Sequence, residues 1–148
     1  DKGNVYRDIA DPFLAEFKMQ MYEETENFYE TKVHKKVVGN MKKILKIEPQ
    51  NAGAMLLKGL SEYGVLNKSE GKKNVADAVN LIKAIKSIDD YSKADQELLE
   101  YALMAYTNFL VEQKDFSGAK SAITLGYPWF KGDEHKEYEA LYNKVVNG

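Results

Sequence analysis

The segment Ile44-Leu45-Lys46-Ile47-Glu48-Pro49-Gln50-Asn51-Ala52-Gly53-Ala54 contains the sharpest break in the helical pattern of the chain. Pro49 disfavours helical geometry at the residue before it, so the preceding helix must end at about Glu48. Asn51 is a favoured N-cap residue, because its side chain can accept a hydrogen bond from a backbone amide of the next turn. The segment therefore predicts two helices joined by a short turn.

Upstream of this turn, apolar residues recur at intervals of three and four, the period of an α-helix. Asp11 followed by Pro12 predicts a helix start, and that helix should reach about Glu30. Its expected buried face carries Phe13, Leu14, Phe17, Met21 and Phe28. The following helix has a stripe of Val33, Val37, Met41, Ile44 and Leu45. Together they predict a helical hairpin.

Downstream, Asn51 should start a third helix, which carries Met55, Leu56, Leu60 and Tyr63. The polar stretch 67–74, including Gly71, predicts a solvent-exposed loop whose shortening the fold should tolerate. A fourth helix then carries Val75, Ala78, Val79, Ile82 and Ile85 and should end near Asp89-Asp90. This pair of helices predicts a second hairpin.

The strongest periodic run in the chain follows Ser92, which with Asp95 three residues on resembles a capping box. It comprises Leu98, Leu99, Ala102, Leu103, Tyr106, Phe109 and Leu110. A turn at 113–115 leads to a short helix from about Phe116 to Leu125, and a last helix begins at about Asp133. The fold class predicted is all-α, with seven helices, no strand and more than about 65% helix, well above the usual third.

The hairpins recur at intervals of roughly 35–45 residues, the range of helical repeats. The repeat boundaries are about 11–48, 49–90 and 92–126, with a capping helix at 133–147, all within one domain, 1–148. The segment 44–54 resembles the junction between tetratricopeptide repeats. In that junction an apolar run is followed by an acid, Pro and Asn, and the next helix carries a small residue before an aromatic one. Gly59 and Tyr63 stand at about the expected places of that pattern.

Further matches to this family are the turn Lys114-Asp115-Phe116 with Ala119 in the third unit, and Ala78 in the second. The chain departs from the family pattern at Lys58, where Leu is usual, and at Val37, where Ala is typical. The resemblance implies antiparallel helical hairpins stacked as a short right-handed solenoid. A non-repetitive helical bundle is the alternative.

Composition excludes several classes of function. The 148 residues are 44% hydrophobic with a net charge of −2, which is typical of one folded domain. The 21 basic and 23 acidic residues leave no electrostatic footprint for nucleic acid. No apolar run approaches the roughly 20 residues of a membrane span, so no membrane insertion is expected. The absence of Cys excludes thiol nucleophiles and thiolate metal sites, and it does not fix the compartment.

Candidate chemical motifs are weak. Gly71-Lys72-Lys73 lacks the upstream Gly and the hydroxyl of a phosphate-binding loop. Ser117 lacks a nucleophile elbow and reads as a helix cap. Glu30 and His34 could share a helix face, and a solvated ion pair explains them better than a metal site. The carboxylates Glu23, Glu24 and Glu26 read as a solvated face. The sequence therefore predicts a protein that is not an enzyme, with no cofactor and no metal.

In tetratricopeptide repeats the first helix of each pair lines a concave groove that takes a peptide or a partner helix. The resemblance implies a groove lined by Tyr22, Tyr29, Leu56, Leu60, Tyr63, Tyr101, Met104, Asn108 and Val111, with Met19 and Glu26 beside it. These residues are alternatively core between the repeats. Only Asn108 matches the Lys and Asn set that family members use to clamp acidic chaperone tails, which disfavours that ligand.

The function expected is therefore a non-catalytic protein–protein interaction module, or scaffold, whose partner is a protein or peptide. A self-associating assembly domain of a larger or exported protein, for example a homodimer, is the alternative, and a small helical enzyme is less favoured. Tyr127, Trp129 and Phe130 are expected to pack between the third unit and the last helix rather than to bind a partner.

Overall fold

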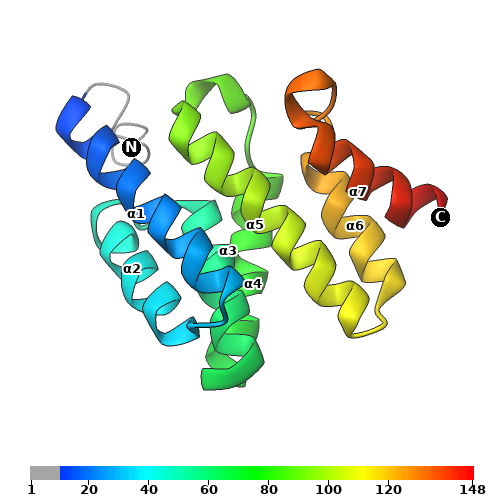
Figure 1. Ribbon diagram of the computed structural model, residues 1–148, viewed down its shortest axis with the longest axis horizontal. Helices are drawn as coiled ribbons and strands as arrows, with labels where there is room; N and C mark the ends of the chain where they lie inside the picture. The colour runs from blue at the N-terminus through cyan, green and yellow to red at the C-terminus, as the bar shows by residue number, and fades with distance from the viewer. Residues whose placement is uncertain (1–10) are drawn as a thin grey trace.

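The computed structural model describes residues 11–148 (Figure 1). It contains α1 (Pro12–Glu30), α2 (His34–Ile47), α3 (Ala52–Ser61), α4 (Lys68–Lys83), α5 (Lys93–Glu112), α6 (Phe116–Gly126) and α7 (Lys136–Asn147). Single turns are the π-helical η3 (Glu62–Leu66) and the 3-10 turns η4 (Ile88–Asp90) and η5 (Asp133–His135). Helix makes up 82% of the described residues, none of which is in a strand, so the all-α prediction is confirmed.

The predicted helix starts are set by side-chain caps. The Asp11 carboxylate accepts from the backbone amide of Phe13 at 3.1 Å, and the Asn51 side chain accepts from Ala54 at 3.1 Å. Each such bond satisfies an amide that has no partner within the helix. The cap of α6 is Asp115, which accepts from the Gly118 amide at 2.9 Å, rather than Ser117 as the sequence suggested.

The loop predicted at 67–74 is wrong, because this stretch forms the first two turns of α4. Asn67 caps the helix by accepting from the Glu70 amide at 3.2 Å. Gly71 is buried, and a Cβ there would overlap the backbone nitrogen of Tyr63. The polar residues of the stretch other than Asn74 are exposed, while Gly71 allows the inner side of α4 to approach the end of α3 closely.

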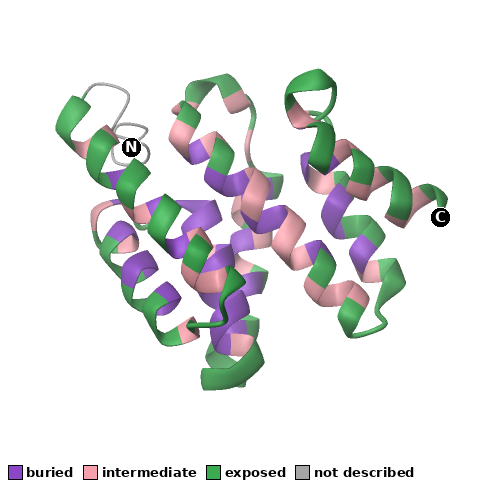
Figure 2. Cartoon of the chain, viewed as in Figure 1, coloured by how far each residue is buried: buried purple, intermediate pink, exposed green. Residues whose placement is uncertain are grey.

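Helix α3 is the centre of the fold. It packs against α2, α4 and α5, and every one of its residues except Met55 is buried. Helix α1 packs on α2 and also on α5, and the two run side by side across the front of Figure 1. Figure 2 shows the buried residues concentrated in the middle of the molecule. The pairs α1–α2, α3–α4 and α5–α6 fall within the three predicted units, and their identity as repeats stays a prediction.

The buried side of α1 differs from the expected one. Phe13 is 86% and Phe17 38% exposed, whereas Lys18, Tyr22 and Thr25 are buried. The apolar stripe that included both phenylalanines is therefore wrong at its N-terminal end. The polar side chains can face inward because each has a hydrogen-bonding partner there, which offsets the cost of burial.

The aromatic cluster after α6 packs against α7 as predicted. Phe130 is buried, and its ring lies 5.4 Å from that of the buried Tyr138. The Tyr138 hydroxyl donates to the backbone oxygen of Ile123 at 2.6 Å. Tyr127 stacks on Tyr142 of α7 with 3.7 Å between ring centres. These contacts attach α7 to the end of the third hairpin.

Candidate interaction surface

Five side chains from distant parts of the sequence form a buried polar cluster: Lys18, Tyr22, Glu48, Asn51 and Asp95. The Lys18 Nζ lies 2.9 Å from Glu48 Oε1 and 2.7 Å from Asp95 Oδ2. The Tyr22 hydroxyl donates to Asp95 Oδ1 at 2.6 Å. All five are at most 4% exposed. The cluster therefore joins α1 to the α2–α3 turn and to the first turn of α5.

Asn51 connects the parts of the buried polar cluster. Its Nδ2 donates to the Tyr22 hydroxyl at 3.0 Å and to Glu48 Oε1 at 3.1 Å, while its Oδ1 caps α3. Burial, followed by the charge of Asp95, raises the pKa of Tyr22 above its ordinary value, so this phenol stays protonated. The arrangement is that of a structural network, in which every member is held by its neighbours.

The space beside the buried polar cluster is too small for an organic substrate. A cavity of about 40 Å³ lies between α1 and α5, lined by Met19, Tyr22, Glu23, Glu26, Ala94, Glu97 and Leu98. A space of this size has room for a few water molecules.

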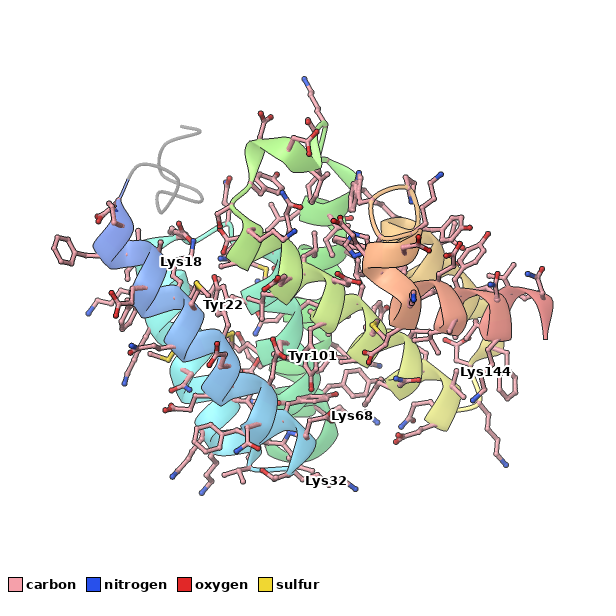
Figure 3. All side chains as sticks on the ribbon, turned by 45° about the horizontal axis from the view of Figure 1, so that its top comes forward. Lys18, Tyr22, Lys32, Lys68, Tyr101 and Lys144 are labelled. Carbon is pink, nitrogen blue, oxygen red and sulfur yellow. The ribbon has the colours of Figure 1, made fainter. Side chains whose placement is uncertain are left out.

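Three of the nine predicted groove residues are core residues. Tyr22 is 4%, Leu56 0% and Leu60 2% exposed. Leu56 and Leu60 belong to α3, which packs against α2, α4 and α5. Helices α1 and α5 also contact each other, as the ring edge of Tyr29 against Tyr101, 6.3 Å between centres, illustrates. The expected groove therefore does not extend over α3. Figure 3 shows Lys18, Tyr22 and Tyr101 following the boundary between α1 and α5.

The other predicted residues keep part of their surface accessible. Four of them follow one side of α5, spaced three and four apart: Tyr101, Met104, Asn108 and Val111. With Tyr29 from α1 they form what we call the α5 strip. Asn108 is exposed and the others are half-buried. Tyr63 lies against Phe109, 5.1 Å between ring centres, where η3 meets α5.

The α5 strip has an acidic border. Burial, and then the charges of Glu97, Glu23 and Glu30, raise the pKa of Glu26 to about 7. Burial, followed by Glu112 and Glu30, raises the pKa of Tyr29 to about 12. The charged groups that shift these two pKa values are all carboxylates, so the border of the strip beside Glu26 and Tyr29 is negatively charged. Complementary ligands would be positively charged.

Both histidines contact a side chain of another element. His34 Nδ1 lies 2.9 Å from the Ser61 hydroxyl of α3, so the predicted solvated pair with Glu30 is replaced by a contact between helices. His135 Nδ1 lies 2.9 Å from Glu100, and burial raises the pKa of that carboxyl. Within residues 11–148, no three metal-ligating side chains gather in a group that could hold an ion.

A second open surface was not predicted from the sequence. A groove of about 660 Å³ lies between the end of α4 and α6, lined by Ile82, Lys83, Ile85, Lys120, Ser121, Thr124, Leu125 and Trp129. Sequence reasoning assigned Trp129 to packing, and its ring does lie 6.0 Å from that of Phe130. The sequence signal that could have revealed this groove is the spacing of four residues along one side of α6: Lys120, Ser121, Thr124 and Leu125.

Comparison of the chain with family models, curated proteins and solved structures finds no significant match. The likeness to tetratricopeptide repeats therefore stays an expectation from the sequence. In the part of the chain that the structure describes, no helix is both long enough and apolar enough to span a membrane.

Proposed function

We propose that this protein is a non-catalytic interaction module that binds a basic segment with apolar side chains along the α5 strip. The observation that supports it is the strip itself, a row of aromatic, methionine and amide side chains left accessible between carboxylates. Tyr and Met are enriched at protein interfaces, and Met adapts to irregular partner surfaces. The carboxylates would select a positively charged partner, because they attract it during association and repel negatively charged partners.

The strip rests on rigid structure, which favours binding. Its four α5 residues project from a helix whose opposite side is buried against α3 and α6. The buried polar cluster fixes α1, and hence Tyr29, beside it. A preformed surface loses less side-chain and backbone freedom on association than a mobile one.

The test is selection from a random peptide library displayed on phage, with the purified protein as bait. Selected peptides are expected to combine Lys or Arg with aliphatic or aromatic residues. Asn108→Lys should weaken their binding by at least about tenfold, because it places a positive charge against a positively charged peptide. Asn108→Asp should not weaken binding.

The matched control is Asn80→Lys, which makes the same change at an exposed position of α4. Peptides should bind this variant as they bind the parent. Selected peptides that are acidic, or whose binding Asn108→Lys leaves unchanged, would contradict the proposal.

A further inference from the structure

The groove between α4 and α6 has the character of a docking site for an apolar group. Its lining includes the apolar side chains of Ile82, Ile85, Leu125 and Trp129. Among the described residues that line the groove, two are charged, Lys83 and Lys120, and both are exposed. The chain as a whole has nearly balanced charge, so a groove with only positive charges is a local feature. An occupant would need apolar side chains flanked by carboxylates.

The N-terminal half of α1 has this complementary chemistry. Phe13 is 86% exposed and Phe17, one turn later, 38% exposed. Asp11 and Glu16 are exposed beside them. The one basic residue of α1, Lys18, is buried inside the molecule and adds no charge to this surface. Two exposed phenylalanines on one acidic helix side are a large apolar area to leave in water.

We propose that the N-terminal half of α1 of one copy docks into the α4–α6 groove of a second copy. Phe13 and Phe17 would contact Ile85, Leu125 and Trp129, while Asp11 and Glu16 approach the lysines at the rim. The proposal does not depend on the α5 strip, which lies on different residues.

The two surfaces cannot meet within one molecule. Helix α1 begins at the left side of the molecule in Figure 1, and α6 lies with α7 at the right. The contact is heterologous, because one surface patch meets a different patch on the next copy. Such contacts produce rings or open chains rather than a dimer that closes on a twofold axis. Association should therefore proceed beyond the dimer as concentration rises.

The first experiment is sedimentation analysis of the wild-type protein over a range of concentrations. The weight-average mass should rise without a plateau at the dimer, and raised salt should shift the rise to higher concentration. Trp129 is the single tryptophan of the chain, so its emission should move to shorter wavelength over the same range. A monomer at all concentrations up to about 1 mM, or a closed dimer, would overturn the proposal.

The second experiment uses two variants, each lacking one of the surfaces. Phe13→Ser with Phe17→Ser removes the apolar side chains of α1, and Lys83→Glu with Lys120→Glu reverses the charge of the groove. Each should weaken self-association by at least about 30-fold, the size of an interface hot spot. All four side chains are at least partly exposed, so folding is preserved, which circular dichroism checks.

Mixing the two double variants is decisive. The first keeps an intact groove and the second an intact α1 surface, so the mixture should form a complex of one to one that grows no further. Val65→Ser, which removes a 65% exposed apolar side chain elsewhere, is the control and should associate like the wild type. A mixture that stays monomeric, or a control that associates as weakly as the double variants, would overturn the proposal.

Discussion

Two regions of this molecule are held together by different chemistry. The N-terminal region, α1 to α3 with the start of α5, is joined through the buried polar cluster. The C-terminal region, the end of α5 with α6 and α7, is joined by the aromatic residues Tyr127, Phe130, Tyr138 and Tyr142. In the first region a charged and directional cluster adds to the apolar packing between helices, and in the second the contacts are mostly apolar.

The difference shows which contacts a local sequence pattern can reveal. Lys18 and Asp95 are 77 positions apart, whereas Tyr138 and Ile123 are 15 apart. A buried charge is stable only when its partner is in place, so the N-terminal region depends on α1, the α2–α3 turn and α5 coming together. Burial of an aromatic side chain against any apolar neighbour is favourable, so its packing does not require one particular partner.

The largest expected effect is that of Asp95→Ala. It leaves the Lys18 ammonium and the Tyr22 hydroxyl without the carboxylate that they contact at 2.7 Å and 2.6 Å. We expect a loss of about 3–5 kcal/mol in the free energy of unfolding, measured by urea denaturation. Asp77→Ala, which removes an exposed carboxylate 3.0 Å from Lys73, is the control and should cost less than about 1 kcal/mol. Equal losses would mean that the buried polar cluster is not a special contact.

Gly71→Ala tests the close approach of α4 to the end of α3. The added methyl group would overlap the backbone of Tyr63, so we expect a loss of about 2–3 kcal/mol in thermal or urea unfolding. Gly39→Ala is the matched control, because nothing lies within 4 Å of that position in α2. It should stabilise the protein by up to about 1 kcal/mol through helix propensity. A neutral Gly71→Ala would restore the exposed loop that the sequence suggested.

Tyr22→Phe and Tyr138→Phe remove one hydroxyl from each region. The Tyr22 hydroxyl donates to a buried carboxylate, whereas that of Tyr138 donates to a backbone oxygen. Hydrogen bonds to charged groups are the stronger kind, so we expect losses of about 2–3 kcal/mol for Tyr22→Phe and about 1 kcal/mol for Tyr138→Phe. Chemical denaturation of both variants beside the wild type decides the order. The reverse order would contradict the contrast between the regions.

The smallest expected effect concerns pH. The pKa of Glu26 is raised from 4.5 to about 7 in the folded protein by burial and by Glu97, Glu23 and Glu30. A raised carboxyl pKa means that the stabilising contribution of the protonated group is complete below pH 4.5 and is lost as pH rises through 7.

Glu26→Gln should therefore stabilise the protein at pH 8. Because Glu26 is only half-buried, solvent screening reduces the effect to about 1 kcal/mol. In the wild type, ionisation of Glu26 should lower the free energy of unfolding as pH rises from 4.5 to 7, and the variant should lack this contribution. Unfolding measured at pH 4.5 and 8 checks both, and a variant that is less stable at pH 8 would contradict the prediction.

Much of the fold could be predicted from the sequence. Pro49 and Asn51 marked the turn between α2 and α3, and the run from Leu98 to Leu110 marked α5. These signals are local, because caps and helical periodicity act over a few residues. Polarity was misleading at 67–74, where the start of α4 is exposed on one side and in backbone contact on the other.

The candidate surface was predicted only in part. The buried side of the N-terminal half of α1 was predicted from Phe13 and Phe17, which are exposed. Nothing local in the sequence indicates that Lys18 has partners at Glu48 and Asp95. The sequence left Leu56 and Leu60 open between groove and core, since their burial depends on how α3 packs against α2, α4 and α5. Long-range pairing of this kind leaves no periodic trace in one sequence.

The position of the accessible surface on α5, with α3 covered, is tested most directly by thiol labelling. The chain has no cysteine, so Asn108→Cys and Leu60→Cys each introduce a single thiol. In the folded protein we expect the thiol at 108 to react with a maleimide as fast as a free thiol, and that at 60 to react at least about 100-fold more slowly, because it needs local unfolding. Equal and fast labelling of both variants, each folded by circular dichroism, would show that α3 is open to solvent and would contradict this position of the surface.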